Sequence, residues 1–164
     1  MSEQAEEQRA GFIPLEPAYE SQAITMLEPW AKFHGYESGE AFLRAAQADD
    51  DTDVMSVTVN DTLAILIVTR RVKMMNELLA LVVEPSYRGH DLGKLALIDA
   101  VRRAGNRPLV VECSDTMRPY YLKQGFRMVG RRKGPDGEFR YRLGAHAPRP
   151  EGEPDPLGRN KGAS

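Results

Sequence analysis

The chain has 164 residues, of which 28% are charged, and its formal net charge is −2. This length suffices for one domain with a hydrophobic core, and the slightly negative charge gives no general attraction to nucleic acids or acidic membranes. No apolar run approaches the roughly 18 residues of a membrane span, and the acidic N-terminus lacks signal-peptide character. The single cysteine, Cys113, suits a reducing compartment. The sequence therefore predicts a cytoplasmic protein that contacts neither nucleic acid nor membrane.

Both ends of the chain are predicted to be disordered. Residues 1–10 are polar and acidic, and residues 146–164 are rich in proline and glycine but poor in aliphatic side chains. Such segments cannot bury enough apolar surface to offset the conformational entropy that is lost on ordering. The folded domain is therefore predicted to span residues 11–145.

Between these ends, the apolar pattern alternates between strand and helix periods. Apolar residues spaced three or four apart predict helices, with Ser38 as the cap of the second one. Period-two alternation and unbroken apolar runs predict strands, and the glycine- and proline-containing residues 134–137 predict a hairpin turn. The expected order is β–α–α–β–β–β–α–β–α–β–β, over residues 12–15, 18–35, 38–48, 54–59, 63–69, 77–83, 92–104, 109–111, 117–124, 127–132 and 138–143. This order predicts an α/β three-layer fold, in which helices cover both faces of a mixed sheet.

The most informative segment is the turn RGHDLG at residues 88–93. It follows the apolar run LLALVV of residues 78–83 and opens the helix predicted at residues 92–104. A buried strand that passes through a glycine-bearing turn into a helix directs several backbone N–H groups at one point, where the helix dipole adds positive charge. The segment therefore predicts a site for a phosphate-like anion, although Asp91 places a carboxylate within it.

Two motifs make the chain similar to the GNAT N-acetyltransferases over about residues 11–144. The first, VEPSYRGHDLG at residues 83–93, is similar to the family's acetyl-CoA signature of Gln or Arg, two residues, Gly, one residue, and Gly or Ala. The second, YLKQGF at residues 121–126, resembles the family's tyrosine-x-lysine-x-Gly-Phe ending. Together with the matching element order, the resemblance implies a GNAT-type fold with a mixed, mostly antiparallel sheet, and acetyl-CoA as the co-substrate.

The resemblance also implies which residues bind acetyl-CoA. In the family two strands splay apart, and the pantetheine arm lies in the V between them. The backbone around Leu81, Val82 and Val83 would bind the pantetheine here, and Ser114 stands where the family often has a cofactor-contacting asparagine. The phosphates would be held by the turn and by the first residues of the following helix. The residues implied for this contact are Arg88, Gly89, His90, Asp91, Leu92, Gly93 and Lys94.

Acetyl transfer to an amine requires a proton acceptor for the amine and a proton donor for the departing thiolate. Tyr121 matches the family position whose phenol protonates the thiolate, although a tyrosine here can also pack its ring under the sheet. Glu77, at the start of the strand before the turn, matches the glutamate base of histone-type members, but a solvated strand-end carboxylate is an equal alternative. The spacing typical of metal ligands is absent from the sequence, so no metal is expected.

Asp91 departs from the glycine that the family usually has at this position. Its carboxylate could cap the helix by accepting N–H bonds from Gly93 or Lys94, which would contribute about 0.5–2 kcal/mol but would put a negative charge in the phosphate site. Alternatively the side chain points to solvent, and Lys94 or His90 offsets its charge; we favour this second interpretation. The first would make the protein a degenerate, non-catalytic acetyl-CoA binder or protein-interaction module.

In the family the acceptor binds at the opposite mouth of the V, against the first two helices and the last hairpin. A cationic amine would be suited there by aromatic rings and carboxylates, namely those of Trp30, Phe33, Tyr36, Glu37, Glu40 and the acidic loop expected at residues 49–53. We favour the alternative, in which Trp30 and Phe33 pack on the sheet and the aspartates form a solvated loop. The sequence thus predicts an N-acetyltransferase in which a primary amine of a small molecule or a protein attacks acetyl-CoA directly. The resemblance also allows a homodimer.

Overall fold

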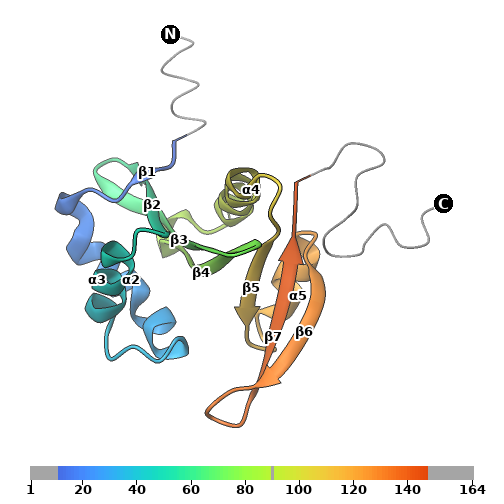
Figure 1. Cartoon of the computed structure of the whole chain (residues 1–164). Helices are drawn as coiled ribbons and strands as arrows, with labels where there is room; N and C mark the ends of the chain where they lie inside the picture. Colours follow the sequence, from blue (N-terminus) through green and yellow to red (C-terminus); the bar gives the residue numbers. More distant parts are fainter. Residues whose placement is uncertain (1–10, 90, 148–164) are drawn as a thin grey trace. The chain divides into compact units, whose positions relative to one another are not determined.

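The structure is a computed structural model, and it describes residues 11–89 and 91–147 (Figure 1). Residues 1–10 and 148–164, for which the sequence predicts disorder, lie outside the described residues. The chain forms two compact units: the first comprises the residues up to Arg70 together with Leu79–Ala96, and the second comprises Arg71–Leu78 together with the residues from Leu97 onward. Within the described ranges, seven strands are hydrogen-bonded in the order β1-β2-β3-β4-β5-β7-β6.

The helices and strands follow the order that the sequence predicts. Their bounds are β1 Ile13–Pro14, α2 Glu20–Phe33, α3 Gly39–Ala48, β2 Thr52–Val59, β3 Thr62–Val72, β4 Met75–Val83, α4 Leu92–Ala104, β5 Leu109–Cys113, α5 Arg118–Lys123, β6 Arg127–Lys133 and β7 Phe139–Ala145. Two single 3-10 turns precede α2 and follow β4, namely η1 (Pro17–Tyr19) and η2 (Pro85–Tyr87). The β4–β5 ladder is parallel, whereas those of β1–β2, β2–β3, β5–β7 and β6–β7 are antiparallel. The predicted mixed, mostly antiparallel sheet of an α/β fold is confirmed.

In the first unit, α2 and α3 pack against each other and against β3 and β4 (Figure 1). Both helices carry small and aliphatic residues at spacings of three or four, which gives each a stripe that can be buried. The core residues come from all four elements and are Ala23, Leu27, Ala31, Phe42, Leu43, Ala46, Leu63, Leu66, Val68 and Ala80. The two helices approach closely at Gly39, where an added Cβ would lie 2.2 Å from the Ile24 carbonyl oxygen. Ser38 Oγ accepts a hydrogen bond from the Ala41 N–H at 3.1 Å, as predicted for the cap of α3.

In the second unit, the strand registers separate a buried face from a charged face. Side chains alternate between faces along a strand, and paired residues share a face. One face carries the buried side chains of Leu78, Leu109, Val111, Cys113, Tyr141 and Leu143. The other face carries a set of residues that we call the charged face, namely Glu77, Glu112, Arg132, Arg140 and Arg142. Cys113 is therefore a core residue, as its apolar strand predicts.

The strands β2 to β6 are longer than the sequence predicts, whereas β1 is shorter. β2 begins at Thr52, so the acidic loop expected at residues 49–53 is shorter than predicted. Asp49 shapes this loop, because its carboxylate accepts hydrogen bonds from the Asp51 N–H at 3.0 Å and from Thr52 Oγ1 at 2.7 Å. Polar residues can sit on a solvated strand face without loss of ladder bonds, so charge is a poor guide to where a strand ends. None of the helices in the described ranges has the length and apolar character needed to cross a membrane.

Candidate functional site

The turn that follows β4 is held by side chains from both of its ends. Glu84 Oε2 accepts a hydrogen bond from the Ser86 N–H at 2.8 Å and so starts η2. Arg88 Nε donates to the Val83 carbonyl at 3.2 Å, so the arginine predicted to contact phosphate also closes the turn back onto β4. A turn that is already held in its shape can bind a ligand with little further ordering cost.

Two residues of this turn, Gly89 and Asp91, have positive φ angles of +87° and +57°. Glycine adopts such angles readily. A Cβ added at Gly89 would meet no atom within 4 Å, so glycine is favoured there by the backbone φ angle and not by a lack of room for a side chain. A side-chain-bearing residue pays about 1–2 kcal/mol for the left-handed conformation, although Asp tolerates it better than most. The glycine that is usual in the resembled signature would fit the backbone of Asp91 without this strain.

The Asp91 carboxylate does not cap α4. A helix N-cap has extended backbone angles, whereas the φ angle of Asp91 is +57°. Its carbonyl accepts the first helical bond from the Leu95 N–H at 3.1 Å, but within the described residues its carboxylate makes no hydrogen bond or ion pair, and the residue is exposed. This geometry agrees with the second interpretation, in which the side chain faces solvent. Lys94, three residues after Asp91, is exposed, and His90 lies outside the described residues.

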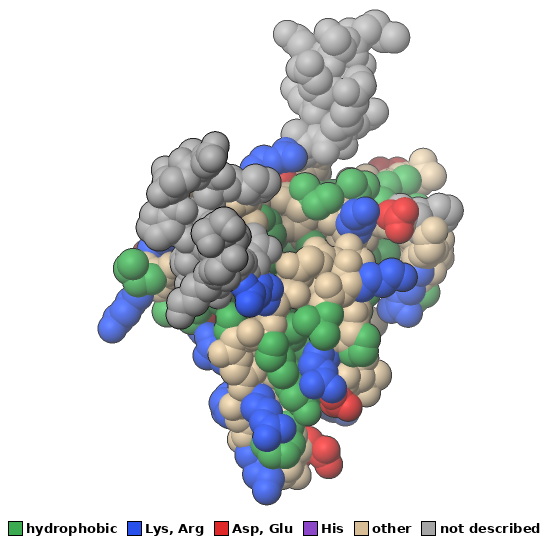
Figure 2. All heavy atoms as spheres, turned by 90° about the vertical axis from the view of Figure 1, so that its right-hand side faces the viewer, with side chains coloured by type: hydrophobic (Ala, Val, Ile, Leu, Met, Phe, Trp, Pro, Cys, Tyr) green, Lys and Arg blue, Asp and Glu red, His purple; other side chains and the backbone are tan. Residues whose placement is uncertain are grey.

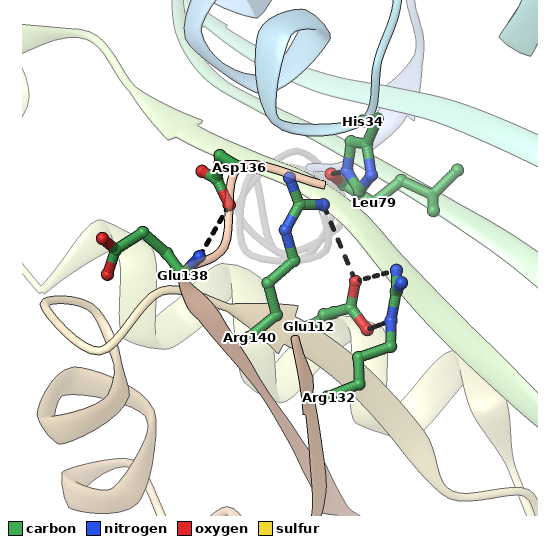
Figure 3. A network of polar contacts seen from close by, with 7 residues as sticks. All are labelled: His34, Leu79, Glu112, Arg132, Asp136, Glu138 and Arg140. Carbon is green, nitrogen blue, oxygen red and sulfur yellow. Dashed lines mark hydrogen bonds and ion pairs between the residues drawn. The ribbon is translucent and has the colours of Figure 1, made fainter. Parts of the chain in front are cut away.

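Beyond Leu78, β4 leaves its ladder with β5. The parallel register covers residues 76–78 of β4 and 109–111 of β5, and it ends there although β4 continues to Val83. The next carbonyl, that of Leu79, is bonded by His34 Nε2 at 2.6 Å (Figure 3). Leu81, Val82 and Val83, whose backbone the resemblance implies for binding the pantetheine arm, follow in β4 and are half-buried. The ladder thus ends just before this backbone segment.

His34 ends α2 within a cluster of aromatic rings. Its ring stacks on Trp30 with centroids 6.1 Å apart and meets Phe33 and Phe42 edge-on at 5.3 and 5.5 Å. Because a carbonyl can only accept, the bond to β4 requires Nε2 to carry the hydrogen. Trp30 packs against the core of the first unit, which is the packing alternative that the sequence left open for it. Nothing in the local sequence signals the contact of His34 with β4.

Tyr121, predicted as the proton donor, is buried in the second unit. Only 1% of its surface is exposed, and its ring meets Tyr120 and Phe126 edge-on at 5.2 and 5.5 Å. Burial, with smaller contributions from the neighbouring Cys113 and Tyr120, raises the pKa of Tyr121 above its usual range. The phenol therefore keeps its proton at neutral pH, as a proton donor must, and it also fills the core under the sheet.

Glu77, predicted as the base, is half-buried in β4 and belongs to the charged face. Tyr121 lies on the other side of this sheet, because its neighbour Cys113 belongs to the buried face. α5 is held against the same buried face, where the Arg118 guanidinium lies 4.2 Å from the centre of the Tyr141 ring. The two predicted catalytic residues thus come from opposite faces of one sheet.

Glu112 is the centre of the charged face. Arg132 holds its two carboxylate oxygens at 2.9 and 2.7 Å, and Arg140 Nη1 lies 3.9 Å from one of them (Figure 3). Burial opposes the charged form, but the bond from Arg132 and the charges of Arg132, Arg140 and Arg142 outweigh it, so the pKa of Glu112 is lowered. In Figure 2, which shows the side of β6 and β7, Lys and Arg side chains gather over the hairpin in the lower part of the view.

Ser114 is half-buried and lies directly after β5, in the turn that leads into α5. Its Oγ accepts a hydrogen bond from the Met117 N–H at 3.3 Å, and its carbonyl accepts from Met117 and Arg118 at 3.2 and 3.1 Å. The serine therefore shapes the entry into α5, and its contact with a cofactor stays a prediction. Across residues 11–89 and 91–147, no group of three or more His, Cys, Asp or Glu side chains is placed to hold a metal ion.

Comparisons with known proteins agree with the motifs. Residues 15–138 match the family described as the acetyltransferase (GNAT) domain. No curated protein matches the sequence. The fold is similar to that of an aminoglycoside 6'-N-acetyltransferase complexed with coenzyme A, with a TM-score of 0.70 and 15% identity over 85% of this chain and 99% of that one.

Two further structures are similar in fold. The aminoglycoside 6'-N-acetyltransferase from Enterococcus faecium has a TM-score of 0.67 and 17% identity, over 85% of this chain and 99% of its own. The ribosomal-protein-S18-alanine N-acetyltransferase from Escherichia coli has a TM-score of 0.65 and 20% identity, over 88% of this chain and 98% of its own. At such identities the likeness establishes the fold, and the acceptors of these proteins differ from one another.

Proposed function

The chain belongs to the GNAT acetyltransferase family, and we propose that it transfers the acetyl group of acetyl-CoA to a primary amine of a small molecule or a protein. The turn after β4 carries this proposal. It is a pre-shaped loop that leads into the N-terminus of a 13-residue helix, with positive φ at Gly89 and cationic side chains at Arg88 and Lys94. Unpaired N–H groups and the dipole of such a helix favour a phosphate group, which suits the pyrophosphate of acetyl-CoA.

The transfer is a direct exchange at the acetyl carbon. Acetyl-CoA supplies an acetyl group activated as a thioester. The amine nitrogen forms a C–N bond with the acetyl carbon, the C–S bond breaks, and the sulfur keeps the electron pair of that bond. The amine loses one proton and the sulfur gains one, so the reaction requires one proton acceptor and one proton donor.

Tyr121 is the proposed proton donor. The raised pKa of its phenol keeps it protonated at neutral pH, and the rings of Tyr120 and Phe126 hold its orientation. A donor whose position is fixed by packing loses little entropy in the transfer. The same packing accounts for much of the burial of Tyr121, so replacement by phenylalanine separates the chemical role of the hydroxyl from the packing role of the ring.

Glu77 is the proposed base. It is a half-buried carboxylate, so it is shielded from bulk water yet still reachable by a ligand. The parallel ladder holds it in register with Val110, at the end of β4 opposite to the phosphate-binding turn. A carboxylate in this position accepts the proton that the amine must lose, directly or through one water molecule.

Titration calorimetry of the full chain with acetyl-CoA tests the first half of the proposal. Micromolar affinity is expected, and coenzyme A should compete for the same site. A panel of primary amines is then screened for release of the CoA thiol, with Glu77→Gln expected to lower kcat while the affinity for acetyl-CoA is retained. The exposed Glu138→Gln is the matched control for loss of one carboxylate. Binding without turnover of any amine would identify a non-catalytic acetyl-CoA binder, and lack of binding would end the proposal.

A further inference from the structure

Arg142 has an unusual partner for a half-buried arginine. Its Nη2 donates a hydrogen bond to the thioether sulfur of Met75 at 3.7 Å. Within the part of the chain that the structure describes, the guanidinium makes no other hydrogen bond. A guanidinium has five N–H donors in a fixed fork that matches a carboxylate or a phosphate. A thioether is a weak acceptor, so most of the donor capacity of Arg142 is not used by protein groups.

The carboxylate in register with Arg142 does not satisfy the remaining donors of its guanidinium. Glu112 is in register with Arg142, but both of its oxygens are held by Arg132, and Arg140 approaches the same carboxylate at 3.9 Å. Glu112 is also only 18% exposed, whereas Arg132 is 56% exposed. The charged face carries three arginines and two glutamates, so it has a formal charge of +1 that one added anionic group would neutralise.

The guanidinium of Arg142 lies close to the proposed base. Met75 and Glu77 are two residues apart in β4 and therefore point to the same face of the sheet, with their Cα atoms about 7 Å apart. Arg142 starts from β7 and reaches across β5 to Met75. The proposed proton acceptor for the amine and an arginine able to bind an anion thus lie on one face, and the residue that Arg142 contacts is two positions from Glu77 in β4.

We propose that Arg142 binds an acidic group of the acceptor, so that this protein acetylates amines that carry a carboxylate or a phosphate close to the amino group. The inference rests on the proposed acetyl transfer and specifies its substrate class. It points away from polycationic acceptors, because the +1 charge of the charged face repels them. An anion held by Arg142 would place the nearby amino group beside Glu77.

The test uses acceptors in matched pairs that differ by one acidic group. Phenylalanine is compared with 2-phenylethylamine for the carboxylate, and O-phosphoethanolamine with ethanolamine for the phosphate. Release of the CoA thiol gives kcat and KM for the wild type, Arg142→Met and Arg142→Lys. Arg131→Met is the matched control, since it removes the same charge from the adjacent strand but from the opposite face, where Arg131 lies over the Phe139 ring.

The wild type should prefer the acidic member of at least one pair by tenfold or more in kcat/KM. Arg142→Met should abolish that preference through KM with little change in kcat, Arg142→Lys should keep part of it, and Arg131→Met should keep it in full. Which pair shows the preference tells carboxylate from phosphate. If Arg142→Met fails to fold in a melting experiment, the comparison of Arg142→Lys with the wild type decides.

Two results would overturn the inference. The wild type could turn over the plain amines as well as their acidic partners, or Arg142→Met could reduce both members of a pair by the same factor. Calorimetry with acetyl-CoA separates these failures from a failure of the proposed function. Normal acetyl-CoA affinity without discrimination between pair members removes the substrate class alone, whereas absence of acetyl-CoA binding removes both proposals.

Discussion

His34 and Leu79 are 45 positions apart in the chain, yet the imidazole Nε2 donates a hydrogen bond to the Leu79 carbonyl at 2.6 Å. The bond joins the end of α2 to the middle of β4, one residue after the parallel ladder with β5 stops. Buried backbone carbonyls are nearly always paired, and here a side chain takes the place of a ladder partner. His34 is thus a structural residue of the first unit, packed among aromatic rings.

Replacement of His34 by alanine should lower the free energy of unfolding by about 1–3 kcal/mol, the cost of an unsatisfied buried carbonyl. Loss of the stacking on Trp30 adds to this effect. Urea denaturation of wild type and variant measures the difference. His34→Gln keeps a side-chain donor and should retain part of the stability, and Lys32→Ala, an exposed position of the same helix, is the control. An effect no larger than that of Lys32→Ala would show that the bond does not stabilise the fold.

Tyr121→Phe should lower kcat about 10²–10⁴-fold, the usual contribution of a positioned general acid. The variant keeps the ring that packs on Tyr120 and Phe126, so its melting temperature and its KM for acetyl-CoA should stay close to the wild-type values. Tyr120→Phe is the matched control, since it removes a hydroxyl from the adjacent residue. If Tyr121→Phe turned over amines at the wild-type rate, the phenol would have a packing role only.

Glu112 should contribute stability that depends on pH. Because its pKa is lowered from the usual 4.5, the carboxylate is almost fully charged in both states above about pH 6, and its contribution is present there. The contribution is lost as pH falls through the lowered pKa of the folded state. Glu112→Gln should therefore be about 1 kcal/mol less stable at pH 7, since Arg132 is largely solvent-screened, and the difference from the wild type should shrink as the pH falls through the lowered pKa of Glu112.

Chemical denaturation across this pH range, at low and at 1 M salt, measures the effect. The difference at pH 7 should shrink at high salt, because exposed charges are screened over about 3 Å at 1 M. Glu138→Gln, an exposed carboxylate in the turn between β6 and β7, is the control. A wild-type minus Glu112→Gln difference that does not shrink as the pH is lowered would contradict the assignment of the lowered pKa to Glu112.

Asp91→Gly should bind acetyl-CoA more tightly than the wild type. The change removes a carboxylate from the N-terminal end of α4, where one charge is worth about 0.3–1 kcal/mol, so a two- to fivefold lower Kd is expected. Glycine also accepts the φ angle of +57° without strain. Asp91→Asn separates the two effects, because it removes the charge and keeps a side chain. Equal affinity of all three proteins would mean that this carboxylate does not act on the phosphate site.

The order of elements was predictable because it depends on short-range patterns. The bounds of α4 and the cap of α3 follow from helical spacing and from one serine. Strand ends were less predictable: β3 continues through Arg70 and Arg71 to Val72, since charged residues can continue a ladder where a strand meets solvent. The positive φ of Asp91 lay beyond prediction, because a single residue type does not specify a left-handed backbone.

The residues of the candidate site also divide into those that a local motif predicts and those that only the tertiary structure places. The turn at residues 88–93 and Tyr121 are visible in the sequence, because each belongs to a contiguous motif. Arg142 carried only a weak signal, the period-two alternation that puts it on one face with Arg140. Its contact with Met75, 67 positions away in the chain, depends on how β4, β5 and β7 are aligned.

The sequence by itself determined the family and the succession of helices and strands, and it located the turn that we propose to bind phosphate, since these rest on residues that are neighbours along the chain. Only the tertiary structure decided that His34 bonds β4, that Glu77 and Tyr121 belong to opposite faces of a sheet, and that Arg142 ends at a thioether. Each of these depends on strand register or helix packing. A shift of one residue in register would turn a side chain to the other face, and no local pattern records that choice.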